Sequence, residues 1–349
     1  MQDNERLNQS LRSPLQPQFI KNRLARIEVH GDTGAPITDA VSVGDAVMAS
    51  FGDGTIRIFR ADSEPKVLQV HQGAILCIAS GDNCVFTGGQ DGRFLKISIE
   101  GSTEELANFG SKWVDCVAAK SGAFACSSGR NSFVWSTAEK EAVKLEHPST
   151  VGGLAFDSAG KRLGVSHYGG VTVWEHKKNQ WKKLKLFWQG SHGPVTFSPD
   201  GKFVITAMQE NALHGWRIRG KIDLAMAGYP GKVKKFTWVG EKPHLVTSGA
   251  NEAICWPFDG PKGPMNRAPM CVARYGRIVV TYVEPFLTQE SVIVGFQDGT
   301  VMLVELDEIK QPIVLRDKTD AEVSAIAITK SGSHLFIGDT MGGTYWTKL

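Results

Sequence analysis

Apolar and polar residues alternate along most of this chain in short segments that are separated by turns. Alternation with a period of two is typical of β-strands that bury one face. One unit recurs: an alternating strand enters a turn of Gly, Asp or Asn, and a second strand follows that often ends on Trp. The spacing of these units is 38 to 48 residues, measured between the last apolar positions of the second strands: Phe59, Ile97, Trp135, Trp174, Trp216, Trp256, Val304 and Trp346.

A period of roughly 40–45 residues with short strands is typical of a β-propeller, in which each repeat forms one small antiparallel sheet, or blade. Glycine accounts for 38 of the 349 residues, and this excess lies in the turns where the period predicts hairpins. Gly, Asn and Asp recur there because they tolerate the positive φ of tight turns. The second turn of each unit falls at residues 52–55, 90–93, 129–132, 168–171, 209–212, 250–253, 297–300 and 341–344.

Counting these turns predicts an all-β propeller of eight four-stranded blades. Residues 23–349 would give about 41 residues per blade for eight blades and about 47 for seven. The irregular stretch 257–290 keeps seven blades open as an alternative. The eighth unit ends after its third strand, and an unpaired strand edge is a liability. We therefore expect residues 23–30 to supply the missing outer strand and close the ring.

Composition changes this picture little. A net charge of +3 gives no strong attraction to nucleic acid or membranes. The first 20 residues lack the apolar stretch of a secretory signal and predict a flexible tail before a single propeller domain over 21–349. No run is long enough for a membrane-spanning helix. The six cysteines show no CxxC pair, which favours buried reduced thiols and a cytoplasmic location.

The repeats resemble the tryptophan–aspartate (WD) repeat family over nearly the whole chain after residue 20. The fifth unit comes closest, with His192-Gly193, the segment 195–202 and Trp216. The resemblance implies a hydrogen-bonded group of a His, a Ser or Thr, a turn Asp and the Trp in each blade. In this sequence the polar group is incomplete in at least two of the units. The second unit has His71, Thr87 and Asp91 but Ile97, and the fourth has His147, Ser166 and Trp174 but Tyr168 or Gly169 in place of Asp.

No catalytic motif is present, and we expect no enzyme activity, no cofactor and no metal. The GxSxG and HExxH signatures are absent. The innermost strands, such as 75–80 and 323–329, are apolar with few charges, Asp115 being the main exception. His167 and His192 could lie near one another in adjacent blades, so a metal-associated or enzymatic propeller stays open as a second alternative.

The expected function is that of a non-enzymatic scaffold that binds other proteins as a monomer. The loops before each innermost strand and the second turns converge on one face around the channel, where variable contacts are natural. Tyr, Trp and Arg dominate binding hot spots. The residues predicted on that face are Gln90, Trp113, Arg130, His167, Tyr168, Trp188, Gln209, Tyr229, Arg274, Tyr275 and Gln297. The competing interpretation is that Trp113, Trp188 and Tyr229 pack between blades.

A basic segment provides the first alternative function. Residues 175–186 carry five lysines on a predicted hairpin, and Lys232, Lys234 and Lys235 add three more. Clustered Lys is what phosphate contacts need, so a nucleic acid or another polyanion is the alternative partner. A solvated hairpin that prevents edge pairing explains the same pattern. Trp181 is the only aromatic residue within it, so nucleic acid is not the expected partner.

Overall fold

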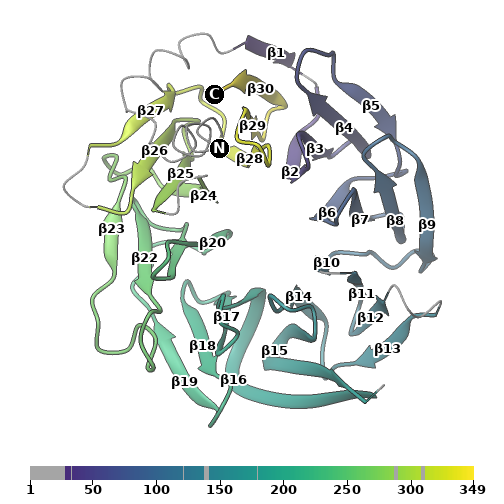
Figure 1. The fold of residues 1–349 in the computed structure, drawn as a ribbon, viewed down its shortest axis with the longest axis vertical. Helices are drawn as coiled ribbons and strands as arrows, with labels where there is room; N and C mark the ends of the chain where they lie inside the picture. The colour runs from purple at the N-terminus through teal and green to yellow at the C-terminus, as the bar shows by residue number, and fades with distance from the viewer. Residues whose placement is uncertain are drawn as a thin grey trace, which may run out of the picture.

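The computed structural model describes residues 28–32, 34–120, 122–136, 141–178, 180–286, 290–307 and 311–349. All regular elements in these ranges are β-strands, so they contain no helix long and apolar enough to cross a membrane. The strands form seven antiparallel sheets arranged in a ring, and each sheet extends from the centre of the ring toward its rim (Figure 1).

Six of the sheets have four strands. The first three consist of β2 (Ile37–Val43), β3 (Ala46–Phe51), β4 (Thr55–Arg60) and β5 (Lys66–Gln69); β6 (Ile75–Ser80), β7 (Cys84–Gly89), β8 (Arg93–Ser98) and β9 (Thr103–Asn108); and β10 (Val117–Lys120), β11 (Ala123–Ser128), β12 (Asn131–Ser136) and β13 (Val143–Glu146). The fourth consists of β20 (Phe236–Val239), β21 (His244–Thr247), β22 (Ala253–Pro257) and β23 (Met270–Val272). The fifth consists of β24 (Val280–Pro285), β25 (Ser291–Phe296), β26 (Val301–Glu305) and β27 (Ile313–Arg316). The sixth consists of β28 (Val323–Ile328), β29 (His334–Asp339), β30 (Gly343–Lys348) and β1 (Glu28–Asp32).

The remaining sheet has six strands, and it shows that the prediction of eight four-stranded blades is wrong. It consists of β14 (Val151–Phe156), β15 (Arg162–Lys177), β16 (Gln180–Phe197), β17 (Phe203–Met208), β18 (Leu213–Arg217) and β19 (Ile222–Met226). Counted as hydrogen-bonded sheets, the ring has seven blades, which was the alternative count. The fourth and fifth repeats share this one sheet.

Two unusually long strands cause the merger. The first part of β15 pairs with β14, and its second part pairs with β16; the far part of β16 then pairs with β17. The segment 168–171 was predicted to be a tight turn, and the chain does fold back there, because the side chains of His167 and Thr172 lie 3.0 Å apart. Tyr168 nevertheless pairs with Ser191, and Gly170 pairs with Phe187. Gly169 and Gly170 have φ of 87° and 132°, so the chain bends here without ending the strand.

The ring is closed by a strand from the beginning of the chain, as expected. β1 pairs antiparallel with β30, with Glu28 opposite Trp346 and Val29 opposite Tyr345. The described part of the closing strand covers residues 28–32, so it includes positions 28–30 of the predicted segment 23–30 and extends to Asp32. The predicted tail 1–20 and residues 21–27 lie outside the described residues.

Apolar side chains pack between neighbouring sheets and form the cores of the ring. Ile56 and Ile58 of β4 meet Val85 and Leu95 of the next sheet, and Phe59 meets Phe336 and Trp346 across the closure. Within the six-stranded sheet, the β15–β16 half also packs on the β17–β18 half. The Trp that ends many repeats is therefore an interface residue, which explains why the spacing of this position revealed the fold.

Candidate binding groove

The loops that join consecutive sheets adjoin the second turns of the repeats, as predicted for the loop face. The backbone N–H of His71 donates to Gly54 O (3.1 Å), and that of Val114 donates to Gly89 O (3.1 Å). Between β27 and β28 the Thr319 N–H donates to Asp298 O (2.9 Å). These bonds fix the loops relative to the sheets, so side chains on this face have a rigid support.

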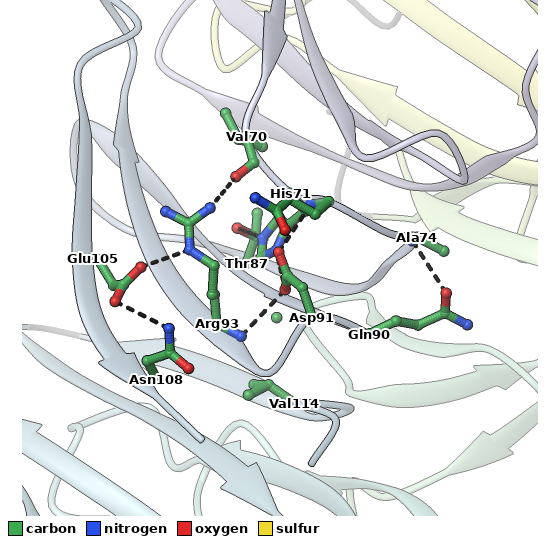
Figure 2. A network of polar contacts seen from close by, with 12 residues as sticks. Val70, His71, Ala74, Thr87, Gln90, Asp91, Arg93, Glu105, Asn108 and Val114 are labelled. Carbon is green, nitrogen blue, oxygen red and sulfur yellow. Dashed lines mark hydrogen bonds and ion pairs between the residues drawn. The ribbon is translucent and has the colours of Figure 1, made fainter. Parts of the chain in front are cut away.

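The second repeat contains the polar group that the resemblance implied (Figure 2). His71 Nδ1 donates to Asp91 Oδ1 (2.8 Å), and His71 Nε2 accepts from the Thr87 hydroxyl (2.9 Å). Burial lowers the pKa of His71, and the bond to Asp91 opposes this effect. The group is complete without a Trp, because Ile97 takes that position and packs in the core.

The sixth repeat forms a similar group with a tyrosine in place of the histidine. The Tyr229 hydroxyl lies 2.7 Å from Thr247 Oγ1 and accepts from Trp256 Nε1 (2.7 Å). Burial raises the pKa of Tyr229 to about 12. Tyr229 was predicted to be a partner-contacting residue, but it is buried in the core between the six-stranded sheet and the β20–β23 sheet. The competing interpretation was the right one for this side chain.

Most of the other predicted contact residues lie at the surface of the loop face. Trp113 is 55% exposed, and Tyr275 lies partly exposed over Phe296 with a ring separation of 5.5 Å. Arg274 donates to Glu252 (3.1 Å). The remaining exposed members of the set are Gln90, Arg130, Gln209 and Gln297. These residues are spread over several sheets and do not form one cluster, whereas Tyr168 and Trp188 come together. His167 lies beside Tyr168 but is buried, so the prediction that its side chain contacts a partner is wrong.

Tyr168 and Trp188 line a groove of about 550 Å³ on the six-stranded sheet. Tyr168 is 61% exposed and Trp188 is 40% exposed. The floor is apolar, and small side chains leave the space open. The other lining residues are Gln189, Gly190, Met208, Glu210, Ala212, Leu213, His214, Ala225, Met226 and Ala227.

Two buried histidines hold the backbone of the two aromatic residues in the same way. His167 Nδ1 donates to the Tyr168 carbonyl (2.9 Å) and Nε2 accepts from the Thr172 hydroxyl (3.0 Å). His192 Nε2 donates to the Trp188 carbonyl (3.1 Å), and Nδ1 accepts from Thr206 (2.7 Å). Burial lowers the pKa of both histidines, so both rings are neutral at pH 7 and each can donate at one nitrogen while accepting at the other.

A third histidine supports the Trp188 ring from below. The Trp188 and His214 rings stack at a centroid distance of 3.9 Å and an angle of 15°. His214 is buried, and its Nε2 has no hydrogen-bond partner among the described residues. Burial lowers the pKa of His214 to about 4. Trp188 therefore has one face fixed against a neutral ring, while 40% of the residue stays exposed beside the groove.

Sequence reasoning missed three features of this site. Phe187 is 72% exposed because it pairs with Gly170, which has no side chain to cover the ring; it does not line the groove. Glu210 lies at the rim, and its carboxylate makes no hydrogen bond or ion pair within the described part of the chain. The floor residue His214 was not considered. The available signal for the exposed Phe187 ring was the occurrence of Phe187-Trp188 on the strand predicted to pair with the one that begins at Gly169-Gly170.

The centre of the ring is more polar than the sequence suggested. Lys235 lies just before β20, and its Nζ donates to Oδ2 of Asp39 in β2 (3.0 Å). This contact passes the inner ends of the two sheets that begin with β24 and β28. The Tyr282 hydroxyl of β24 also donates to Asp39 (2.6 Å). Burial raises the pKa of the nearby Glu284 to about 8, with Lys235 opposing this effect and Asp39 adding to it. The interpretation that Asp115 is the main charged exception is therefore wrong.

The basic segment forms the predicted hairpin, with His176 opposite Trp181. Lys177 is paired with Glu175 (2.8 Å). The three additional lysines are engaged elsewhere: Lys232 donates to Gln209 (2.7 Å), Lys234 pairs with Glu322 (2.8 Å), and Lys235 pairs with Asp39. The two lysine groups do not act as one free basic surface.

Buried thiols and histidines show no metal-binding arrangement in the described ranges. No group of three or more His, Cys, Asp or Glu side chains there could hold a metal ion. The six cysteines form no disulfide; Cys84, Cys126 and Cys255 are buried and the other three are partly buried. Burial raises the pKa of Cys116 to about 12, so this thiol stays protonated and unreactive.

Comparisons with known structures support a WD40-like propeller fold. A computationally designed protein, Ika8, superposes with a TM-score of 0.74 at 18% identity, covering 91% of this chain and 98% of that chain. The C-terminal WD40 domain of Sif2 superposes with a TM-score of 0.71 at 12% identity, covering 93% of this chain and 98% of that domain. No protein-family model matches the chain, and neither does any curated protein. At these identities the likeness concerns the fold.

Proposed function

We propose that this protein is a non-catalytic interaction module that binds a partner protein in the groove beside Tyr168 and Trp188. The observation that carries the proposal is that buried histidines fix the backbone of two exposed aromatic residues and that one of the two rings is also supported from beneath. The His167 and His192 bonds fix their backbones, and His214 fixes the Trp188 ring. Rigid, exposed Tyr and Trp side chains are favoured in binding hot spots because little entropy is lost when they are covered.

The fold of this chain agrees with such a role, since WD40-like propellers present loops on a rigid ring. The cytoplasmic location and the monomeric state stay predictions. The polyanion alternative is not favoured, because several of its lysines are already paired with acidic or amide side chains.

Comparative affinity capture tests the proposal. The wild-type chain, the Tyr168→Ala/Trp188→Ala double variant and a Trp113→Ala control are used as baits in extract from the native cell. Trp113 is a matched control because it is an exposed Trp on the same face but lies between other sheets. We expect at least one protein to be captured by the wild type and the control and lost with the double variant. Its purified form should then bind the wild type at least tenfold more tightly than the double variant.

Equal recovery with all three baits would refute this location for the site. Loss with the Trp113→Ala control alone would place the contact on another part of the loop face. Unchanged thermal unfolding of the double variant shows that any loss of binding is not a loss of fold.

A further inference from the structure

We propose that the groove accepts a positively charged side chain, a lysine or an arginine, presented by the partner. This inference rests on the proposed function and specifies the chemistry of the ligand. Three observations support it: the free face of Trp188, the unpaired carboxylate of Glu210 at the same rim, and the absence of any other charged residue among the groove-lining residues.

Aromatic faces attract cations because the ring quadrupole is negative above the plane, and Trp is the strongest of the side chains in this respect. One face of Trp188 is covered by His214 at 3.9 Å, so the cation site is the other face. The pKa of His214 is lowered by burial, which means that the supporting ring carries no charge that would repel a cation at neutral pH.

Glu210 supplies the counter-charge. It is exposed in the turn between β17 and β18, and it makes no ion pair or hydrogen bond in the described part of the chain. The adjacent Gln209 accepts a hydrogen bond from Lys232 through its side-chain oxygen (2.7 Å). Glu210 thus remains available to a charge that comes from outside.

The groove also fits the stem of such a side chain. Met208, Leu213 and Met226 give it an apolar floor, and its volume of about 550 Å³ exceeds what one side chain fills. A lysine or arginine can bury its methylene stem on apolar surface while its charged head stays near the rim. An acidic side chain would lie against Glu210 with no cation among the lining residues to balance it.

Small probes test this chemistry on the full-length protein. Butylammonium imitates a lysine side chain, n-butanol is its neutral counterpart of the same size, and butyrate is an anion. Each is titrated at constant ionic strength into protein labelled with ¹⁵N at tryptophan. Binding is followed by the indole signal of Trp188, which is assigned with Trp188→Phe. We expect a saturable shift with butylammonium, at least fivefold weaker binding of n-butanol, and no shift with butyrate.

The variant Glu210→Gln should weaken butylammonium binding at least fivefold and leave n-butanol binding within twofold. The matched control is Glu64→Gln, which removes the same charge from an exposed position outside the groove. Equal binding of butylammonium and n-butanol, no Trp188 shift, or no effect of Glu210→Gln would each overturn the inference. The proposed function is tested separately by the affinity capture with the Tyr168→Ala/Trp188→Ala variant, because that experiment does not depend on the charge of the ligand.

Discussion

Replacing His214 by Phe should make the protein less sensitive to acid. His214 lies between Trp188 and Trp216, with ring centroids at 3.9 and 4.8 Å. Phe keeps an aromatic ring between the two indoles and removes the buried Nε2 that has no hydrogen-bond partner among the described residues. The variant therefore changes the proton balance of this site while retaining its packing.

The magnitude follows from the pKa difference between the folded and unfolded chain. Burial lowers the pKa of His214 from 6.5 to about 4 in the folded protein. The folded state binds fewer protons than the unfolded state between these values, so this contribution to stability is complete above pH 6.5 and is lost as the pH falls toward 4. At pH 5 the loss amounts to about 2 kcal/mol, a substantial part of the stability of an ordinary domain.

Other groups contribute to the same pH range, so the test compares the variant with the wild type. His147, whose pKa burial also lowers to about 4, acts in the same direction. Glu284 acts in the opposite direction: its pKa is raised to about 8, so its contribution is lost as the pH rises from 4.5 toward 8. Both are present in wild type and variant, and their effects cancel in the difference.

The assay is urea unfolding of both proteins at pH 7.5 and pH 5.0, with the free energy of unfolding obtained by linear extrapolation. The wild type should lose about 2 kcal/mol more than His214→Phe between the two pH values. Equal losses, within about 0.5 kcal/mol, would show that His214 is not held neutral by burial, and the account of the Trp188 support would fail with it.

Three further predictions concern the ring. Deleting residues 1–32 removes β1 from the edge of β30 and should lower the melting temperature relative to deleting 1–20; equal melting temperatures would contradict closure by β1. Tyr229→Phe removes the hydroxyl that serves Thr247 and Trp256 and should cost about 1–3 kcal/mol in urea unfolding, with a non-additive effect when combined with Thr247→Val. Asp39→Asn should lower the pKa of Glu284 and Lys235→Met should raise it, as followed by ¹³C NMR of the carboxyl group; shifts of the opposite sign would refute the polar group at the centre.

The repeat spacing was enough to predict a ring of small sheets, because one apolar position per repeat must reach a neighbouring sheet. Closure was predictable for the same physical reason, since β30 would otherwise be an open edge. The merger of the fourth and fifth repeats into one sheet could not be predicted. The sequence Tyr168-Gly169-Gly170 has the composition of a turn, and only the pairing of Tyr168 with Ser191 shows that the strand continues.

The site was predicted only in part, since exposure cannot be read from residue type. Tyr229 and Tyr168 are both adjacent to a glycine in the sequence, yet one hydroxyl completes a buried network and the other ring is exposed. The difference depends on whether a Thr and a Trp of the same sheet lie within reach. Glu210 carried no signal of its own, because an unpaired surface carboxylate becomes informative only beside Trp188.

The incomplete WD-type group of the fifth repeat explains how one side of the groove is held in place. In the second repeat the His71 N–H is used by Asp91. The fifth repeat has no Asp in the equivalent turn, and a buried N–H without a partner is costly. Its histidine, His192, instead donates to the carbonyl of Trp188. The fourth repeat lacks the turn Asp as well, but its equivalent histidine, His147, bonds to Ser132 and leaves Nδ1 without a partner among the described residues. In the fifth repeat the bond that replaces the missing Asp therefore also fixes an exposed aromatic residue of the groove.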